Sequence, residues 1–346
     1  MNKKSIVIGC IVVLLVALSY LNVIPEKGVV YLLFNILLIV AGFYMLIKGA
    51  DIFVDGASKI ATKFNIPQMV IGLTIVAFGT SLPEAAVSIK AALADNAGIT
   101  VGNVVGSNIL NILLILGVSA CIAALPIKKN TFLIEMPTVI IVTVVLLLLG
   151  VKGNVISFVD GLILCGIMVV FMVYLVIQAK NGESDDETVL SEKDTMIKLL
   201  LFVAIGLVCI VVGSNVTVDA ASYVADKCGM SSRLIGLTIV AFGTSLPELV
   251  TSATAAKRGK VDIAIGNIVG SNILNILFVV GVSALITPVA FAAEFIKDTV
   301  VAIAAAVLLF VCVMNKERKL TKIGGVIMLV CYVAYFAYIL VANYAA

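Results

Sequence analysis

The chain is a succession of long apolar segments separated by short polar ones. A helix of about 20 apolar residues crosses roughly 30 Å of hydrocarbon, whereas the strands of a membrane barrel show alternating patterns of about ten residues. The uninterrupted runs of this chain fit helices. Membrane-spanning helices are predicted at residues 5–24, 29–56, 67–94, 99–124, 131–150, 156–178, 196–225, 231–256, 261–286, 293–314 and 322–343. The predicted fold class is an all-α integral membrane protein.

A polar stretch at residues 180–195 divides the predicted helices into two groups. Its many acidic residues are more typical of a solvated linker than of a binding tail. Five helices precede it within residues 29–179, and five follow it within residues 196–346. We therefore expect two membrane units joined by a short linker.

The first predicted helix lies outside this arrangement. Within residues 1–28, Lys3 and Lys4 precede an apolar run, and Ala17 to Ser19 loosely fit a cleavage site. Residues 1–28 are thus either an additional N-terminal transmembrane helix or a signal peptide. Both alternatives give the other ten helices the same orientation.

The two groups of helices contain the same motifs. The segment IGLTIVAFGTSLPE occurs at residues 71–84 and, identically, at 235–248, and GNVVGSNILNIL at 102–113 matches GNIVGSNILNIL at 266–277. Because each group has an odd number of helices, equivalent helices enter the membrane from opposite sides. The sequence therefore predicts two inverted five-helix repeats, about ten core helices in all. Secondary transporters use such repeats for alternating access, with the site where the halves meet.

Basic residues are concentrated in alternate loops. Most of the 23 lysine and arginine residues fall at one set of helix ends, and the other set has little beyond Lys27, Lys152, Lys227, Arg233 and Lys297. Loops rich in lysine and arginine remain in the cytoplasm. The linker belongs to the lysine-rich set, so we predict a multi-pass protein of the cell membrane, inner or plasma, with a cytoplasmic linker.

The composition of the chain argues against most classes of enzyme. The chain is 62% hydrophobic and 12% charged, with a mean hydropathy of +1.23, unlike a soluble domain. It has no histidine, so haem ligation through imidazole, zinc hydrolysis and Ser-His-Asp chemistry lose their usual residue. Its seven cysteines lie mostly in apolar runs without CxxC spacing. We expect no cofactor, no nucleic acid and no obligatory protein partner; the expected partner is the bilayer.

The GTSLPE motif places a proline and a glutamate in the middle of one helix in each half. Pro83 has no amide hydrogen and its ring clashes with the carbonyl of Gly79, so the helix must kink or break, and Pro247 acts on Gly243 in the same way. Carbonyls released near Ala77 and its equivalent are natural partners for cations at membrane depth. The alternative is a proline kink in which small residues serve packing alone.

Glu84 and Glu248 stand apart from most of the 20 acidic residues, which lie at predicted helix ends or in loops. An ionisable group inside the membrane is costly and by default functional. Two carboxylates carry a charge that matches one Ca2+ and supply roughly half of the six to eight oxygens that this ion binds. With no thiolate or imidazole nearby, hard cations are favoured. For Asp51, Asp55 and Asp219, near helix ends, a solvated role and a place on the ion path both remain open.

The helix after each motif carries uncharged oxygen donors four residues apart, which places them on one helix face. They are Asn103, Ser107 and Asn111 in the first half and Asn267, Ser271 and Asn275 in the second. The alternative is hydrogen bonding between helices, aided by glycines with small-xxx-small spacing. We favour packing for Asn103 and Asn267, and ion contact for the serines and the last asparagines.

These paired motifs resemble the α-repeats of the cation/Ca2+ antiporter superfamily, in particular Na+/Ca2+ exchangers of prokaryotic type. The resemblance covers the chain from about residue 29 to its end. It implies ten core helices with four ion positions at mid-membrane. By motif, it implies a Ca2+ position formed by Glu84, Glu248, Thr80 and Thr244, flanking Na+ positions involving Ala77, Ala241, Ser81, Ser245, Ser107 and Ser271, and a centre lined by Asn111 and Asn275.

The resemblance implies a secondary transporter rather than an enzyme, which exchanges Na+ and Ca2+. We expect alternating access, and we expect it to be electrogenic because one Ca2+ leaves the two site charges near neutral whereas three Na+ would leave the centre positive. Some archaeal and K+-dependent relatives have an aspartate at the position of Asn275, so we predict that exchange is independent of K+. An H+/Ca2+ exchanger of the same superfamily is the main alternative. A cation channel is a more distant one, because channel rings usually come from several subunits or repeats. No nucleophile or cofactor motif supports a membrane enzyme that uses paired carboxylates.

Overall fold

The computed structural model describes residues 3–21, 28–94, 98–182, 190–191, 194–230, 239 and 241–344. Most of the linker at 180–195 and the first part of the helix predicted at 231–256 lie outside the described residues. Within the described part, eight helices are long and apolar enough to cross a membrane, or nine if one bent pair counts as one span. The predicted all-α membrane fold is confirmed.

In the first half, most of the predicted helices consist of several consecutive helical segments. Their bounds are α1 Lys3–Tyr20, α2 Gly28–Lys63, α3 Gln68–Ile71, η1 Gly72–Val76, α4 Ala77–Thr80, α5 Leu82–Leu93, α6 Gly98–Leu110, η2 Asn111–Leu116, α7 Gly117–Ile122, η3 Thr131–Glu135, α8 Met136–Val151 and α9 Phe158–Asn181, where η marks a π-helical turn. The helix predicted at 29–56 thus continues to Lys63. Ala57, Ile60 and Ala61 are buried, and their burial extends the packed face beyond the apolar run.

The second half repeats the order of the first. Its elements are α10 Met196–Lys227, α12 Ala241–Gly243, α13 Leu246–Lys257, α14 Val261–Leu274, η5 Asn275–Val280, α15 Gly281–Ile286, α16 Ala293–Cys312 and α17 Lys322–Tyr344. The motif-bearing spans lie at the centre of the molecule. The most apolar windows of spans 99–122 and 261–286 are 72% and 83% buried, whereas those of α9 and α17 are 17% buried. The exposed apolar side chains of the outer helices suit contact with lipid.

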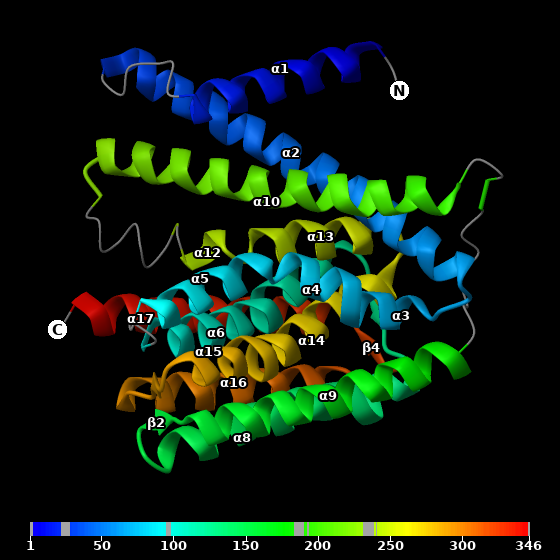
Figure 1. Ribbon diagram of the computed structural model, residues 1–346, viewed down its shortest axis with the longest axis vertical. Coiled ribbons are helices and arrows are strands. Elements are labelled where there is room, and N and C mark those ends of the chain that lie inside the picture. Colours follow the sequence, from blue (N-terminus) through cyan, green and yellow to red (C-terminus); the bar gives the residue numbers. More distant parts are fainter. Residues whose placement is uncertain are drawn as a thin grey trace.

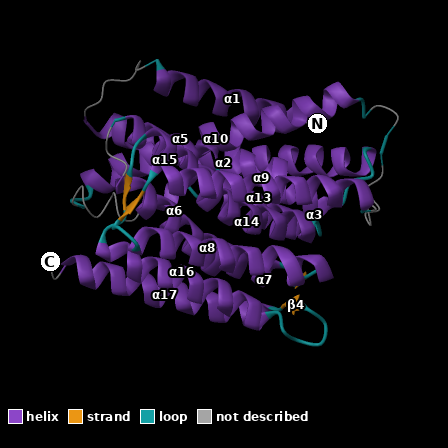
Figure 2. Cartoon of the chain, turned by 60° about the horizontal axis from the view of Figure 1, so that its bottom comes forward, coloured by secondary structure: helices purple, strands orange, loops and turns teal. Residues whose placement is uncertain are grey.

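Two long helices lie across one side of this centre. In Figure 1, α2 and α10 cover it with α1 outermost, and α8 and α9 lie on the opposite side; Figure 2, a rotated view, again shows α1 at the outer edge. Glycines allow α2 and α10 to approach closely. A Cβ added at Gly49 would lie 2.9 Å from the carbonyl oxygen of Gly206, and one added at Gly206 would lie 2.8 Å from the carbonyl oxygen of Gly49. Small residues serve this purpose in membrane helices because they let backbones touch.

Two short antiparallel ribbons connect the halves. Strand β1 (Leu125–Pro126) pairs with β4 (Lys319–Leu320), and β2 (Val155–Ile156) pairs with β3 (Val289–Ala290). The shift that superposes the two repeats carries β1 onto β3 and β2 onto β4. The ribbons are therefore equivalent, one at each end of the molecule. We call the end with β1 and β4 the lysine-rich end and the end with β2 and β3 the opposite end.

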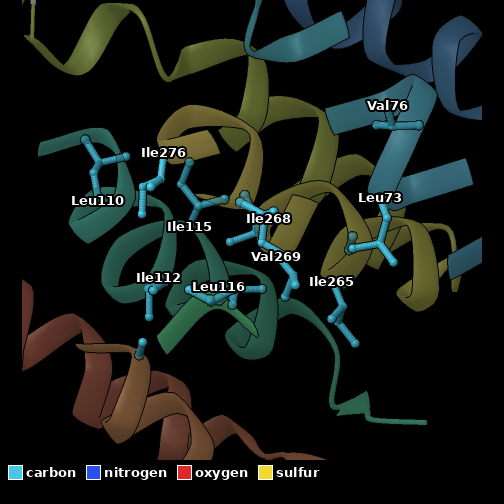
Figure 3. Close-up of a cluster of buried hydrophobic side chains, with 14 of the residues drawn as sticks. Leu73, Val76, Leu110, Ile112, Ile115, Leu116, Ile265, Ile268, Val269 and Ile276 are labelled. Atoms are coloured by element: carbon cyan, nitrogen blue, oxygen red, sulfur yellow. The ribbon is translucent and has the colours of Figure 1, made fainter. Parts of the chain in front are cut away.

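The apolar core lies between the two motif-bearing spans. Figure 3 shows side chains of η1, of α6 with η2, and of α14 with η5 in one cluster, among them Leu73, Ile115 and Ile268, which are completely buried. The polar site residues lie on these same spans. The site residues are thus carried by closely packed spans, which transmit small shifts rather than absorb them.

Candidate functional site

Both motif helices break before their proline, as predicted. In the first half α4 ends at Thr80, α5 begins at Leu82, and the two parts are bent by 50°. In the second half α13 begins at Leu246, after Ser245. Pro83 cannot donate to the carbonyl of Gly79, so the helical ladder stops at this point.

The break does not release every carbonyl that the sequence indicated. The carbonyl of Ala77 accepts a hydrogen bond from the amide of Ser81 at 3.0 Å. The physical reason is that proline removes one donor only, the one directed at Gly79. Ala241, the equivalent of Ala77, begins α12.

The two glutamates are fully buried and are held by serines of the other half. Ser81 Oγ donates to Glu248 Oε1 at 2.8 Å, and Ser245 Oγ donates to Glu84 Oε1 at 3.1 Å. Ser271 Oγ lies 3.5 Å from Glu248 Oε1. The serines at the two breaks thus bring the two carboxylates to one place, between the repeats.

Each carboxylate leaves its second oxygen without a partner. Glu84 Oε2 and Glu248 Oε2 are buried and accept no hydrogen bond from the described residues. A buried ionised oxygen in this condition is costly unless a cation or proton binds it. The described residues contain no group of three or more acidic, cysteine or histidine side chains that could hold a metal ion together. A cation at this place must therefore take its remaining ligands from neutral oxygens.

Asparagines on the following spans supply such oxygens. Asn111 and Asn275 are fully buried, and the Oδ1 atom of each has no partner among the described residues. Asn111 Nδ2 donates to Asn272 Oδ1 at 3.0 Å, and Asn275 Nδ2 donates to Asn108 Oδ1 at 3.2 Å. Sequence reasoning did not single out Asn108 or Asn272. Their signal was present, since both follow the serine of the repeated GSN sequence.

Asn103 and Asn267 are engaged in bonds between helices. Asn103 Nδ2 donates to the main-chain oxygen of Glu84 at 3.2 Å and to Ser88 Oγ at 3.0 Å. Asn267 Nδ2 donates to Ser252 Oγ at 2.9 Å, and its Oδ1 accepts from Thr80 Oγ1 at 2.9 Å. These contacts fix the half-helices that carry the glutamates against α6 and α14. Thr244, the equivalent of Thr80, is partly exposed.

A cavity reaches this region from the opposite end. Its volume is about 1190 Å3, and it runs between α2, α6, α10, α16 and α17. Glu294 and Asp298 lie on its wall near β3, and Asn103, Gly106 and Ser107 lie deeper along it. The cavity thus extends from the opposite end as far as Ser107, whereas Glu84 and Glu248 are completely buried beside it and do not line it.

The equivalent helix of the second half, α14, is tightly packed. A Cβ added at Gly270 would lie 2.7 Å from Ala77 Cβ and 2.9 Å from Leu73 Cα, so α14 packs directly on η1 and α4. A Cβ added at Gly106, the equivalent position on α6, would meet no described residue within 4 Å; the equivalents of most of η1, residues 236–238 and 240, lie outside the described part of the chain. Among the described residues, the same sequence pattern therefore lines a cavity in the first half and a packed interface in the second.

Ion pairs connect elements at the lysine-rich end. Arg258 Nη2, just after α13, lies 2.7 Å from Asp51 Oδ1 on α2. Lys198 Nζ of α10 lies 2.7 Å from Asp194 Oδ1, and Lys59 Nζ of α2 lies 3.5 Å from Asp194 Oδ2. The hydrogen bond from Lys198 lowers the pKa of Asp194 to about 2, so this carboxylate is charged throughout the physiological range.

A third buried acid was not singled out from the sequence. Glu135 is fully buried in η3, where its Oε1 accepts hydrogen bonds from Tyr174 at 2.5 Å and Gln178 at 3.1 Å on α9. Its position near the end of a predicted span suggested exposure. Long-range packing of α9 buries it instead, which periodicity along one segment cannot report.

Comparisons with known proteins agree with this arrangement. The family model described as sodium/calcium exchanger protein matches residues 34–177 and again residues 198–341. The chain is 36% identical over 260 residues to the inner membrane protein YrbG of Escherichia coli, covering 72% of this chain and 79% of that protein. It is 30% identical over 341 residues to the sodium/calcium exchanger MaX1 of Methanosarcina acetivorans, covering 87% of this chain and 97% of that protein.

A solved structure has the same fold. The sodium-calcium exchanger NCX_Mj, soaked with zero Na+ and Ca2+, superposes with a TM-score of 0.75 at 33% identity, covering 88% of this chain and 98% of that one. The match includes both halves of the chain, and the family model identifies the same two halves as copies of one unit. The chain belongs to the sodium/calcium exchanger protein family.

Proposed function

We propose that this protein exchanges Na+ for Ca2+ across the cell membrane by alternating access, with Glu84 and Glu248 as the shared ion ligands. One observation carries the proposal. Two buried carboxylates, one from each repeat, are held by serines of the other repeat, and each retains an oxygen without a partner. That arrangement suits an ion which binds where the halves meet and leaves again.

The ligand set that we propose is the one implied by the family resemblance, and the free carboxylate oxygens support it. Glu84 Oε2 and Glu248 Oε2 with the hydroxyls of Thr80 and Thr244 would bind Ca2+, which takes six to eight oxygens at about 2.3–2.6 Å. Na+ would use the same carboxylates and flanking oxygens in turn. These are the carbonyls of Ala77 and Ala241 and the hydroxyls of Ser81, Ser245, Ser107 and Ser271, with Asn111 and Asn275 at the centre.

Alternating access is supported by the difference between the two ends. The cavity extends inward from Glu294 and Asp298 at the opposite end, while α14 packs directly on η1 and α4. If the lysine-rich end is cytoplasmic, as the positive-inside rule indicates, this arrangement faces outward. The pair α2 and α10, which lies across the centre and is joined by glycines, is the element that would move against the rest.

The charge of the site predicts voltage dependence. A Ca2+ neutralises two carboxylates, whereas three Na+ would leave the loaded site with a net positive charge. Moving one charge through the membrane field changes the free energy by about 2.3 kcal/mol per 100 mV. Exchange is then electrogenic, and it extrudes Ca2+ when the Na+ gradient points inward. The neutral Asn111 and Asn275 add no charge for K+, so K+ should not be required.

Uptake of radioactive Ca2+ into proteoliposomes tests the function. Vesicles are loaded with Na+, K+ or choline, or with a proton gradient, at clamped voltage. We expect Ca2+ to accumulate above its external concentration only in Na+-loaded vesicles. Uptake driven by the proton gradient alone would establish H+/Ca2+ exchange instead. Ca2+ entry that never exceeds equilibrium and needs no counter-ion would establish a channel.

A further inference from the structure

Two asparagines outside the ion ligands connect the repeats through their main chains. Asn108 and Asn272 are equivalent residues with exposed fractions of 2% and 0%. Asn272 Nδ2 donates to the main-chain oxygen of Asn108 at 3.2 Å, and Asn108 Nδ2 donates to the main-chain oxygen of Asn272 at 3.1 Å. The two bonds mirror each other across the interface between α6 and α14.

These bonds decide which atom of each amide is oxygen. A main-chain carbonyl can only accept, so the side-chain atom beside it must be the NH2 group. The oxygen of Asn272 is then the atom that accepts from Asn111 Nδ2 at 3.0 Å. The oxygen of Asn108 likewise accepts from Asn275 Nδ2 at 3.2 Å.

The orientation of the Asn108 and Asn272 amides in turn fixes the orientation of Asn275 and Asn111. Because the NH2 groups of Asn111 and Asn275 are occupied, their Oδ1 atoms point the other way, and both are buried without a partner. A rotated amide would place NH2 hydrogens there, which carry partial positive charge and repel a cation. The direction of two amides thus decides whether the centre attracts or repels ions.

We propose that Asn108 and Asn272 are positioning residues for ion exchange, which hold Asn275 and Asn111 with their carbonyl oxygens toward the ion centre. The control runs crosswise: Asn272 of the second repeat orients Asn111 of the first, and Asn108 orients Asn275. The inference rests on the proposed function, because it takes Asn111 and Asn275 as residues that face ions.

A double-mutant cycle tests the crosswise control. KM for Na+ and for Ca2+ is measured separately from the maximum rate in proteoliposomes, with Asn272→Ala alone, in an Asn111→Ala background and in an Asn275→Ala background. The single change should raise both KM values about three- to tenfold, as expected for one lost hydrogen bond. In the Asn111→Ala background, Asn272→Ala should raise the KM values by less than a further factor of about two. In the Asn275→Ala background, it should raise them by its full factor of about three to ten.

The mirror cycle is the matched control. Asn108→Ala should lose its effect in the Asn275→Ala background and keep it in the Asn111→Ala background. This cycle is independent of the first, so it decides the question if Asn272→Ala fails to fold, which size-exclusion elution and melting temperature reveal. Equal effects in both backgrounds would assign these residues to packing alone and overturn the positioning role. If Asn111→Ala and Asn275→Ala leave both KM values unchanged, these asparagines do not face the ions and the positioning role falls, whereas the proposed function falls only if Na+-loaded vesicles also fail to accumulate Ca2+.

Discussion

The strongest test of the site is the removal of one charge at a time. Glu84→Gln keeps the shape of the side chain and one oxygen, but lowers the charge of the centre from −2 to −1. If the new amide keeps its hydrogen bond from Ser245, its NH2 group occupies the place of the partnerless Oε2. Glu248→Gln has the same consequence through Ser81. Each variant thus loses an anionic ligand and presents a donor to the cation.

The electrostatic magnitude separates Ca2+ from Na+. At an effective dielectric constant of about 20, two unit charges 4 Å apart interact by about 4 kcal/mol. Ca2+ therefore loses about 8 kcal/mol of attraction, and one Na+ about 4 kcal/mol. If solvent and the remaining ligands compensate for half of the loss, about 4 kcal/mol remains for Ca2+, which weakens binding about a thousandfold.

Both glutamine variants should therefore lose most Na+-driven Ca2+ uptake in proteoliposomes. Asp55→Asn is the matched control, because Asp55 pairs with Lys59 at 3.0 Å on the same helix and is remote from the breaks. It should retain substantial transport, as should Asp219→Asn. Size-exclusion elution and reconstitution efficiency must be equal for all variants. Near-normal exchange by either well-folded glutamine variant would refute the reasoning and leave that glutamate as a structural part of a broken helix.

Four further outcomes are expected. Exchange at clamped voltage should persist when K+ is removed, and its disappearance would contradict the K+-independent centre. In a chain without native cysteines, Ser184→Cys in the linker should resist an impermeant thiol reagent added outside intact cells, since labelling would place the lysine-rich end outside. The same reagent should label Ser107→Cys, on the cavity, much faster than its buried equivalent Ser271→Cys, and equal rates would rule out a one-sided opening. Arg258→Ala removes the ion pair with Asp51, so labelling of Ser271→Cys from the lysine-rich end should increase. The increase should be up to about fivefold, because a partly exposed ion pair contributes up to about 1 kcal/mol. Unchanged labelling would show that this pair does not hold the end closed.

The sequence predicts the features of this fold that are encoded locally. Long apolar runs give the helices, and the proline of GTSLPE gives the break that the structure places after Thr80. Because the repeated unit has an odd number of helices, the sequence predicts that the second unit is inverted in the membrane relative to the first. Glu84 and Glu248 could be found because each lies in an apolar segment that otherwise excludes charge.

Features that depend on contacts between distant segments could not be predicted in this way. The roles of Asn108 and Asn272 depend on hydrogen bonds that cross the interface, and an asparagine beside another polar residue gives no local signal of direction. Glu135 is buried by α9, more than 30 positions away in the sequence. The carbonyl of Ala77 was expected to be free, but the local turn at Ser81 provides a donor.

The exact repeat also explains why the open end could not be read from the motifs. Residues 71–84 and 235–248 are identical, and the glycine spacing of α6 and α14 is the same, yet one of these helices lines a cavity and the other is packed. The same residues can therefore form both arrangements, and the choice between them must come from unpaired features. The bond between Asp51 and Arg258 is such a feature, because the equivalent residues, Asn215 and Ala94, cannot form an ion pair.

The strength of that ion pair is consistent with a carrier. Two states that exchange during transport must lie within a few kcal/mol of each other, or one of them would never be populated. Identical motifs on both sides make the packing of the two arrangements similar, which keeps the difference small. An exposed ion pair contributes at most about 1 kcal/mol. If Arg258→Ala increases labelling as expected, a pair of this strength would favour closure of the lysine-rich end without preventing its opening.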